Sequence, residues 1–151
     1  MKKFFIILLM MVLVCSAFAH EAHKENTTAV YGTVGTFVLY FNAGINVERK
    51  IWDPGYLLLD ELWLHGGFNG WKVMDKNGVS AVLSIHALTG KKMLHFEYGL
   101  GLTYIPGSAT DWVVFPSVNF GVRYQKPGNS LILRTGIGFP EIAYLSAGYA
   151  F

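Results

Sequence analysis

Apolar and small polar residues alternate through almost the whole sequence after residue 29, and no stretch has a convincing helical period. In residues 94–105, for example, every second residue is Leu, Phe or Tyr, and His, Glu, Gly or Thr lie between most of them. A period of two puts alternate side chains on opposite faces of a β-strand. The pattern predicts eight strands, at residues 30–37, 41–50, 62–73, 79–88, 94–105, 116–125, 131–139 and 143–151.

Short segments rich in turn-forming residues separate these strands. Pro and Gly occur in 53–55 and 126–130, and Asn and Gly in 75–78, where they supply the backbone angles of tight turns. Connections this short join only antiparallel neighbours, because a parallel pair needs a crossover of a dozen or more residues. We therefore expect one all-β domain over residues 30–151, folded as an eight-stranded antiparallel up-and-down β-barrel.

The first nineteen residues have the pattern of a secretory signal peptide. Lys2 and Lys3 precede an unbroken apolar run at 4–14, and the small-x-small site of residues 17–19 follows it. A helix of this length is too short to span about 30 Å of hydrocarbon, which argues against a membrane anchor. We expect export and cleavage after residue 19.

Removal of this segment argues against nucleic-acid binding and against sites that depend on cysteine. The sequence has 12 basic and 10 acidic residues, and without Lys2 and Lys3 the mature chain is close to neutral. It therefore lacks the positive charge typical of nucleic-acid binding. The only cysteine, Cys15, also lies in the signal, so we expect no disulfide and no cysteine-bound metal. Residues 20–29 are polar and are expected to form a flexible tail.

The two faces of the strands decide between two kinds of barrel. A soluble lipocalin-like barrel points its apolar face inward around an apolar ligand, whereas a membrane barrel points this face at lipid. The polar faces here carry few charges, although a water-facing sheet normally carries many. Aromatic residues lie near strand ends, as in the girdles of membrane barrels. They are Phe41, Phe96, Tyr104, Tyr124, Phe139 and Tyr149. A transmembrane β-barrel is therefore favoured, with a soluble periplasmic barrel as the alternative.

Several short motifs occur in a characteristic order. They are NVER at 46–49, LTGKK at 88–92, RYQKPG at 123–128 and the terminal strand SAGYAF at 146–151. In these motifs the sequence resembles the small (eight-stranded) outer-membrane β-barrel proteins of Gram-negative bacteria. That family has an NYER-like strand end, an L-x-GKK turn and a YRYQ-x-(P)-G turn, so Val47 departs from its pattern.

The resemblance implies a barrel in the cell outer membrane, without settled biochemical activity and without catalytic residues to transfer. Tyr149 and Phe151 at the C-terminal end look like the signal that the barrel-assembly machinery recognises. Outer-membrane lipid and this machinery are the expected partners. We expect no cofactor.

An eight-stranded barrel is just wide enough for its own side chains to fill it. We therefore expect a plugged polar lumen and no open pore. The residues predicted to face the lumen are Asn42, Asn46, Glu48, His86, His95, Glu97, Asn119, Arg123 and Arg134. Two acids and two arginines balance in this set, so its buried charges are expected to pair.

The turn at 89–92 predicts how the fourth and fifth strands pair. In the predicted register His86 faces His95, and Ser84 faces Glu97. Ser84, His86 and Glu97 also have the residue types of a nucleophile, a base and an orienting acid, so a lipid-modifying enzyme is a third hypothesis. Their expected lumen position argues against it, because an enzyme acting on lipid needs these groups on the outer wall.

Metal binding is a further hypothesis for the same region. His86 and His95, with His65 as a third imidazole, have the donor types of a Zn²⁺ site, and Glu97 would be an additional ligand. Lumen histidines more often serve as polar filling, so no metal is expected.

Membrane barrels keep both termini in the periplasm and their long loops outside. The longest external link is then residues 106–115, and Asp111, Trp112 and Phe115 are its candidate contact residues for a surface ligand.

Overall fold

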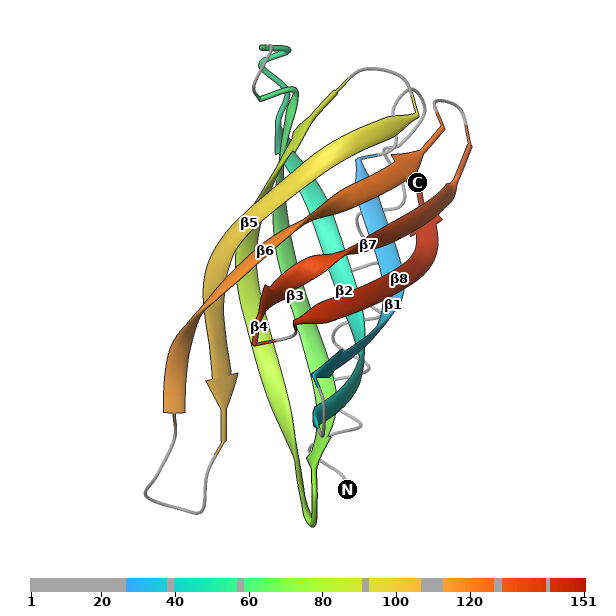
Figure 1. Cartoon of the computed structure of the whole chain (residues 1–151). Coiled ribbons are helices and arrows are strands. Elements are labelled where there is room, and N and C mark those ends of the chain that lie inside the picture. Colours follow the sequence, from blue (N-terminus) through green and yellow to red (C-terminus); the bar gives the residue numbers. More distant parts are fainter. Residues whose placement is uncertain are drawn as a thin grey trace.

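The structure is a computed structural model that describes residues 27–37, 40–56, 59–90, 93–106, 113–126, 129–140 and 142–151. These residues form β1 (Thr28–Phe37), β2 (Tyr40–Trp52), β3 (Glu61–Val73), β4 (Lys76–Thr89), β5 (Leu94–Ile105), β6 (Val113–Gln125), β7 (Leu131–Phe139) and β8 (Ala143–Ala150). Each strand pairs antiparallel with the next, and β1 pairs with β8, which closes the barrel (Figure 1). The described residues contain no helix long and apolar enough to cross a membrane.

The predicted fold class, an all-β antiparallel barrel of eight strands in chain order, is confirmed. The largest differences are at β4 and β6, which both begin three residues earlier than expected. Residues 75–78 were expected to form the turn before β4, but Val73 pairs with Lys76, so only Met74 and Asp75 connect the strands. Met74 has a φ of 49°, which is the left-handed conformation used in two-residue hairpin turns.

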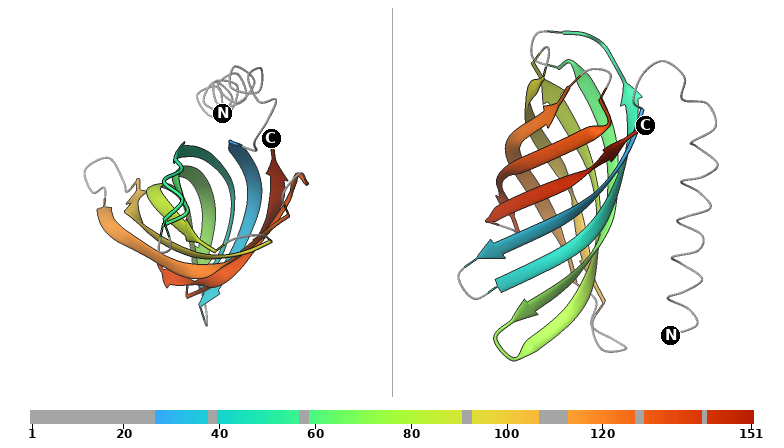
Figure 2. Two further views of the ribbon diagram at one scale, coloured as in Figure 1. Left: turned by 90° about the horizontal axis from the view of Figure 1, so that it is seen from above. Right: turned by 90° about the vertical axis from the view of Figure 1, so that its right-hand side faces the viewer.

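The barrel has two distinct ends, which are visible in Figure 2. At the N/C end, Phe151 exchanges backbone hydrogen bonds with Thr28, at 2.8 and 2.9 Å. The links from β1 to β2, β3 to β4, β5 to β6 and β7 to β8 lie at the opposite end, which we call the distal end. Because the C-terminal residue is bonded to the start of β1, the last strand ends in register with the first.

The outer and inner faces of the barrel differ as the alternation predicted. Large hydrophobic side chains are exposed on the outside of every strand. The most exposed include Phe96 and Leu100 at 69%, Ile137 at 61%, Leu83 at 60% and Ile45 at 59%. The buried side chains of the interior are mainly polar or charged. This distribution is the reverse of that in a water-soluble barrel, whose apolar residues gather inside.

Most of the buried apolar residues form one small cluster. It contains Ala29, Tyr31, Trp63, Leu88, Ile132 and Ala150. Apart from Tyr31, which reaches deeper, these residues occupy the last few positions of their strands at the N/C end. The apolar cluster therefore forms a floor beneath the polar interior.

Candidate functional site

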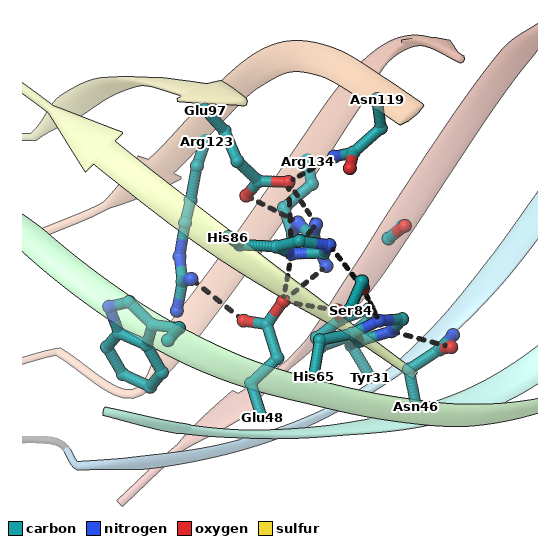
Figure 3. Close-up of polar contacts among 12 residues, drawn as sticks. Tyr31, Asn46, Glu48, His65, Ser84, His86, Glu97, Asn119, Arg123 and Arg134 are labelled. Atoms are coloured by element: carbon teal, nitrogen blue, oxygen red, sulfur yellow. Dashed lines mark hydrogen bonds and ion pairs between the residues drawn. The ribbon is translucent and has the colours of Figure 1, made fainter. Parts of the chain in front are cut away.

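The interior contains a compact group of charged and aromatic side chains, which we call the lumen cluster (Figure 3). Its members are Tyr31 of β1, Glu48 of β2, His86 of β4, Glu97 of β5, Arg123 of β6 and Arg134 of β7. None of them is more than 4% exposed. Six strands each contribute one residue, so the cluster ties together most of the circumference of the barrel.

Glu48 lies at the centre of the lumen cluster. Its Oε1 accepts a hydrogen bond from the Tyr31 hydroxyl at 2.6 Å and lies 2.8 Å from His86 Nδ1. The same oxygen is 3.1 Å from Arg134 Nη1, and Oε2 accepts from Arg123 Nη1 at 2.9 Å. A buried carboxylate needs this number of donors to replace its lost hydration.

Glu97 forms the second ion pair. Arg134 donates from Nε to Glu97 Oε2 at 2.9 Å and from Nη2 to Oε1, so the pair is bidentate. Asn119 donates a further hydrogen bond to Oε1 at 3.1 Å. Arg134 is therefore shared between Glu97 and Glu48, which gives the guanidinium an anion on two sides.

The two arginines are direct cross-strand neighbours, because Arg123 pairs with Arg134 in the β6–β7 ladder. Like charges in this position repel each other. Each guanidinium also lies 4.4 Å from an aromatic ring centroid, Arg123 over Trp63 and Arg134 over Tyr31. Glu48 contacts both arginines, so it is the residue that allows the two cations to lie side by side.

A chain of hydrogen-bonded polar groups extends from the lumen cluster towards the distal end. Ser84 Oγ lies 2.9 Å from His86 Nε2 and 2.6 Å from His65 Nδ1. His65 Nε2 lies 3.0 Å from Asn46 Oδ1, and the two imidazole rings stack at 4.6 Å. Asn46 in turn donates to Thr33 Oγ1 at 2.9 Å. All four side chains before Thr33 are buried, so the chain extends the buried network of the lumen cluster.

The predicted register between β4 and β5 is wrong by four residues. His86 pairs with Gly99 and not with His95, while Ser84 pairs with Gly101 and not with Glu97. A Cβ at position 99 would overlap the His86 ring and the Asn119 amide. The observed register is therefore the one that gives the imidazole a neighbour without a side chain.

Of the nine residues predicted to face the lumen, the structure brings five together in the lumen cluster: Glu48, His86, Glu97, Arg123 and Arg134. Another of the nine, His95, lies opposite Arg123 in the β5–β6 pair. Within the described residues, its buried Nδ1 has no hydrogen-bond partner. Tyr31 was missed, because a tyrosine in a glycine-rich strand is equally compatible with either face.

In the hypothesis of a lipid-modifying enzyme, the acid that orients His86 was expected to be Glu97, but the structure places Glu48 closer to His86. His86 Nδ1 is 2.8 Å from Glu48 Oε1 but 3.6 Å from Glu97 Oε1. Glu48 therefore takes the orienting position that sequence reasoning gave to Glu97.

The described carboxylate and imidazole groups that lie close enough to share a metal ion are Glu48, His86 and Glu97, whose ligand atoms are within 4.8 Å of one another. His95 is not part of this group. Both carboxylates already accept hydrogen bonds from arginine. A divalent cation would have to displace a guanidinium, so the donor set fits charge pairing better than metal binding.

A cavity of about 60 Å³ adjoins the lumen cluster on its distal side, and its lining includes His65, Ser84, His86, Arg134 and Tyr144. The cavity has room for a few water molecules and is far smaller than the sites that hold organic ligands.

Asp111 and Trp112 fall outside the described residues, as does the segment 1–26. Phe115 belongs to β6, and its ring contacts Phe139 edge to face at 5.7 Å. Tyr149 is exposed on the outer face, with its ring 6.5 Å from that of Phe151.

Comparison with known proteins bears on the fold. No protein-family model matches the sequence, and no curated protein matches it. Among solved structures, the chain is similar to the N-terminal β-barrel domain of Pseudomonas aeruginosa OprF, with a TM-score of 0.57 and 14% identity. The match covers 85% of this chain and 100% of that domain. At this identity the likeness supports the barrel fold alone.

Proposed function

We propose that this chain is an integral outer-membrane β-barrel protein with a plugged, charge-paired lumen and a structural or surface-interaction role. The observation that carries the proposal is the continuous belt of exposed apolar side chains around a closed barrel. Exposed aromatic residues such as Phe41, Phe96 and Tyr149 lie near strand ends, as in the girdles of membrane barrels. Closure satisfies the backbone hydrogen bonds, which a lipid environment requires.

The interior argues against a soluble barrel that carries an apolar ligand. Such a carrier needs an apolar cavity of several hundred cubic ångströms. Here the lumen cluster contains four formally charged side chains, Glu48, Glu97, Arg123 and Arg134, and the cavity beside them is about 60 Å³. The same features support a plug without porin-like conduction.

The proposed location sets the orientation. Both termini face the periplasm, and the distal end faces the outside. The C-terminal strand, with Tyr149 and Phe151, is the proposed contact for the barrel-assembly machinery. Residues 106–115 remain the proposed place for contact with a surface ligand, through Asp111, Trp112 and Phe115.

Fractionation of cells that express the full chain tests the location. The proposal expects the protein in the outer-membrane pellet after an alkaline carbonate wash, because a membrane-spanning barrel resists extraction. Recovery in the soluble periplasmic fraction would overturn it.

A second candidate function, a serine hydrolase, is favoured by one observation. Ser84, His86 and Glu48 are linked by contacts of 2.9 and 2.8 Å, in the order that nucleophilic catalysis uses. However, His65 also contacts the Ser84 oxygen at 2.6 Å, and Ser84 is buried. The adjoining space is too small for an acyl chain.

We therefore expect Ser84 to be unreactive. The folded protein, incubated with a small fluorophosphonate, should keep its intact mass, and Ser84→Ala should leave the membrane lipid pattern unchanged. A mass increase that disappears in the Ser84→Ala variant would instead favour the hydrolase.

A further inference from the structure

A groove lies on the outer face of the barrel near the distal ends of β2, β3 and β4. It is shallow and largely open, with a volume of about 380 Å³, and is lined mainly by Phe41, Gly70, Lys72, Asn77 and Val79. Phe41 and Val79 are 55% and 53% exposed and form its walls. Gly70 forms the floor between them, because it has no side chain to fill the space.

A single cation lies at the distal end of this groove. Lys72 pairs with Phe41 on one side and with Asn77 on the other, two residues beyond Gly70 on the same face of β3. Lys72 is exposed, and within the described residues no acidic side chain forms an ion pair with it. The groove therefore combines an apolar channel with a free ammonium and an amide at one end.

We propose that this groove binds one anionic, phosphate-bearing membrane lipid in preference to a zwitterionic one, with its phosphate on Lys72 and Asn77 and one acyl chain over Gly70. The inference rests on the proposed membrane location and adds a specific lipid site to it. The proposal rests on charge complementarity, because Lys72 is the positive group among the described residues that line the groove, and it lies at the distal rim. At the headgroup level of a membrane, the anions that such a group meets are lipid phosphates. A lysine stem lying along apolar surface also keeps its ammonium at the level of the headgroups.

The binding energy is divided between the two parts of the site. An acyl chain that leaves the bilayer for the groove gains packing but little hydrophobic energy, since lipid tails are as apolar as the groove. The phosphate contact therefore supplies the selectivity, and one lysine near an anionic surface corresponds to about a fivefold preference.

Native mass spectrometry of the full chain in detergent tests the phosphate contact. The probes are dioleoyl phosphatidic acid and dioleoyl phosphatidylcholine in equal amounts, which differ only in the headgroup. Wild-type protein should carry about fivefold more phosphatidic acid, and Lys72→Gln should lose this preference. Lys76→Gln is the matched control, because Lys76 pairs with Val73 and so lies on the opposite face of the sheet. An unchanged preference in Lys72→Gln, or an equal loss in Lys76→Gln, would overturn the site.

A second pair of variants tests the groove itself. Gly70→Leu should fold, because the nearest atom to an added Cβ is the Ala43 carbonyl oxygen at 3.9 Å, and it should reduce adducts of both lipids. Gly66→Leu is equally open, with Val82 O at 3.9 Å, but lies outside the groove, so its adducts should match wild type. Protein dimers that disappear only in Gly70→Leu would instead assign the groove to a second copy of this chain.

The failure of this inference is distinguishable from the failure of the proposed function. A wild-type chain that floats with phospholipid vesicles but binds both lipids equally would overturn the lipid site alone. A chain that remains free of the vesicles would overturn the membrane location and the lipid site with it.

Discussion

Glu48→Gln should destabilise the barrel by about 3–5 kcal/mol, the usual cost of removing one partner of a buried ion pair. The substitution leaves Arg123 and Arg134 adjacent in the β6–β7 ladder, with Glu97 as the remaining acid of the lumen cluster and in contact with Arg134. It also weakens the acceptor that serves the Tyr31 hydroxyl and His86. Urea unfolding in lipid vesicles, followed by tryptophan fluorescence, measures the loss.

Two comparisons make the Glu48 result specific. Glu97→Gln should cost less, because Arg134 keeps its contact with Glu48 and only one arginine loses an acid. Adding Arg123→Met to Glu48→Gln should restore part of the stability, because the surplus charge is removed while contact with Trp63 is retained. A Glu48→Gln variant within about 0.5 kcal/mol of wild type would show that the charge pairing contributes little.

Leu100→Arg should destabilise the protein in lipid vesicles by about 2–4 kcal/mol, as expected for arginine on the lipid face at the bilayer midplane. Leu100 lies midway along β5 and is 69% exposed on the outer face. Leu94→Arg is the matched control on the same face, at the N/C end of β5, where about 0–1 kcal/mol is expected. Urea titration of both variants in vesicles provides the comparison.

The depth dependence is what separates a lipid-facing wall from a water-facing one. On the surface of a soluble barrel, both arginines would be solvated, and both variants would lie within about 0.5 kcal/mol of wild type. Equal small effects at the two positions would therefore contradict the membrane proposal.

Alternation alone predicted which side chains face the lumen, because a period of two assigns a face to every residue of a strand. Glu48, Glu97 and Arg134 are accordingly inside. The register of β4 on β5 was not predictable in this way, since a shift by any even number of residues, here four, preserves every face. What fixes it is the space over Gly99, where the His86 ring and the Asn119 amide pack.

The alternation of the sequence also did not predict the inward position of two aromatic residues near the lumen charges. Tyr31 and Trp63 lie inside the barrel, although aromatic residues in such strands are expected to face lipid. Their contacts explain the position, because each ring lies 4.4 Å beneath an arginine and each polar group donates to a carboxylate. Arg123, Arg134 and Glu48 are distant in sequence from the rings they contact, so the closed barrel brings them together, whereas Glu61 lies two residues from Trp63.

The mobility of the membrane-extracted protein on SDS gels, unheated against boiled, tests the central claim most directly. A closed barrel with paired backbone groups stays folded in SDS until it is heated. The account predicts that the unheated sample migrates faster than the boiled one, in material that resists a carbonate wash. Identical mobility before and after boiling, with the protein recovered from the soluble periplasmic fraction, would contradict it.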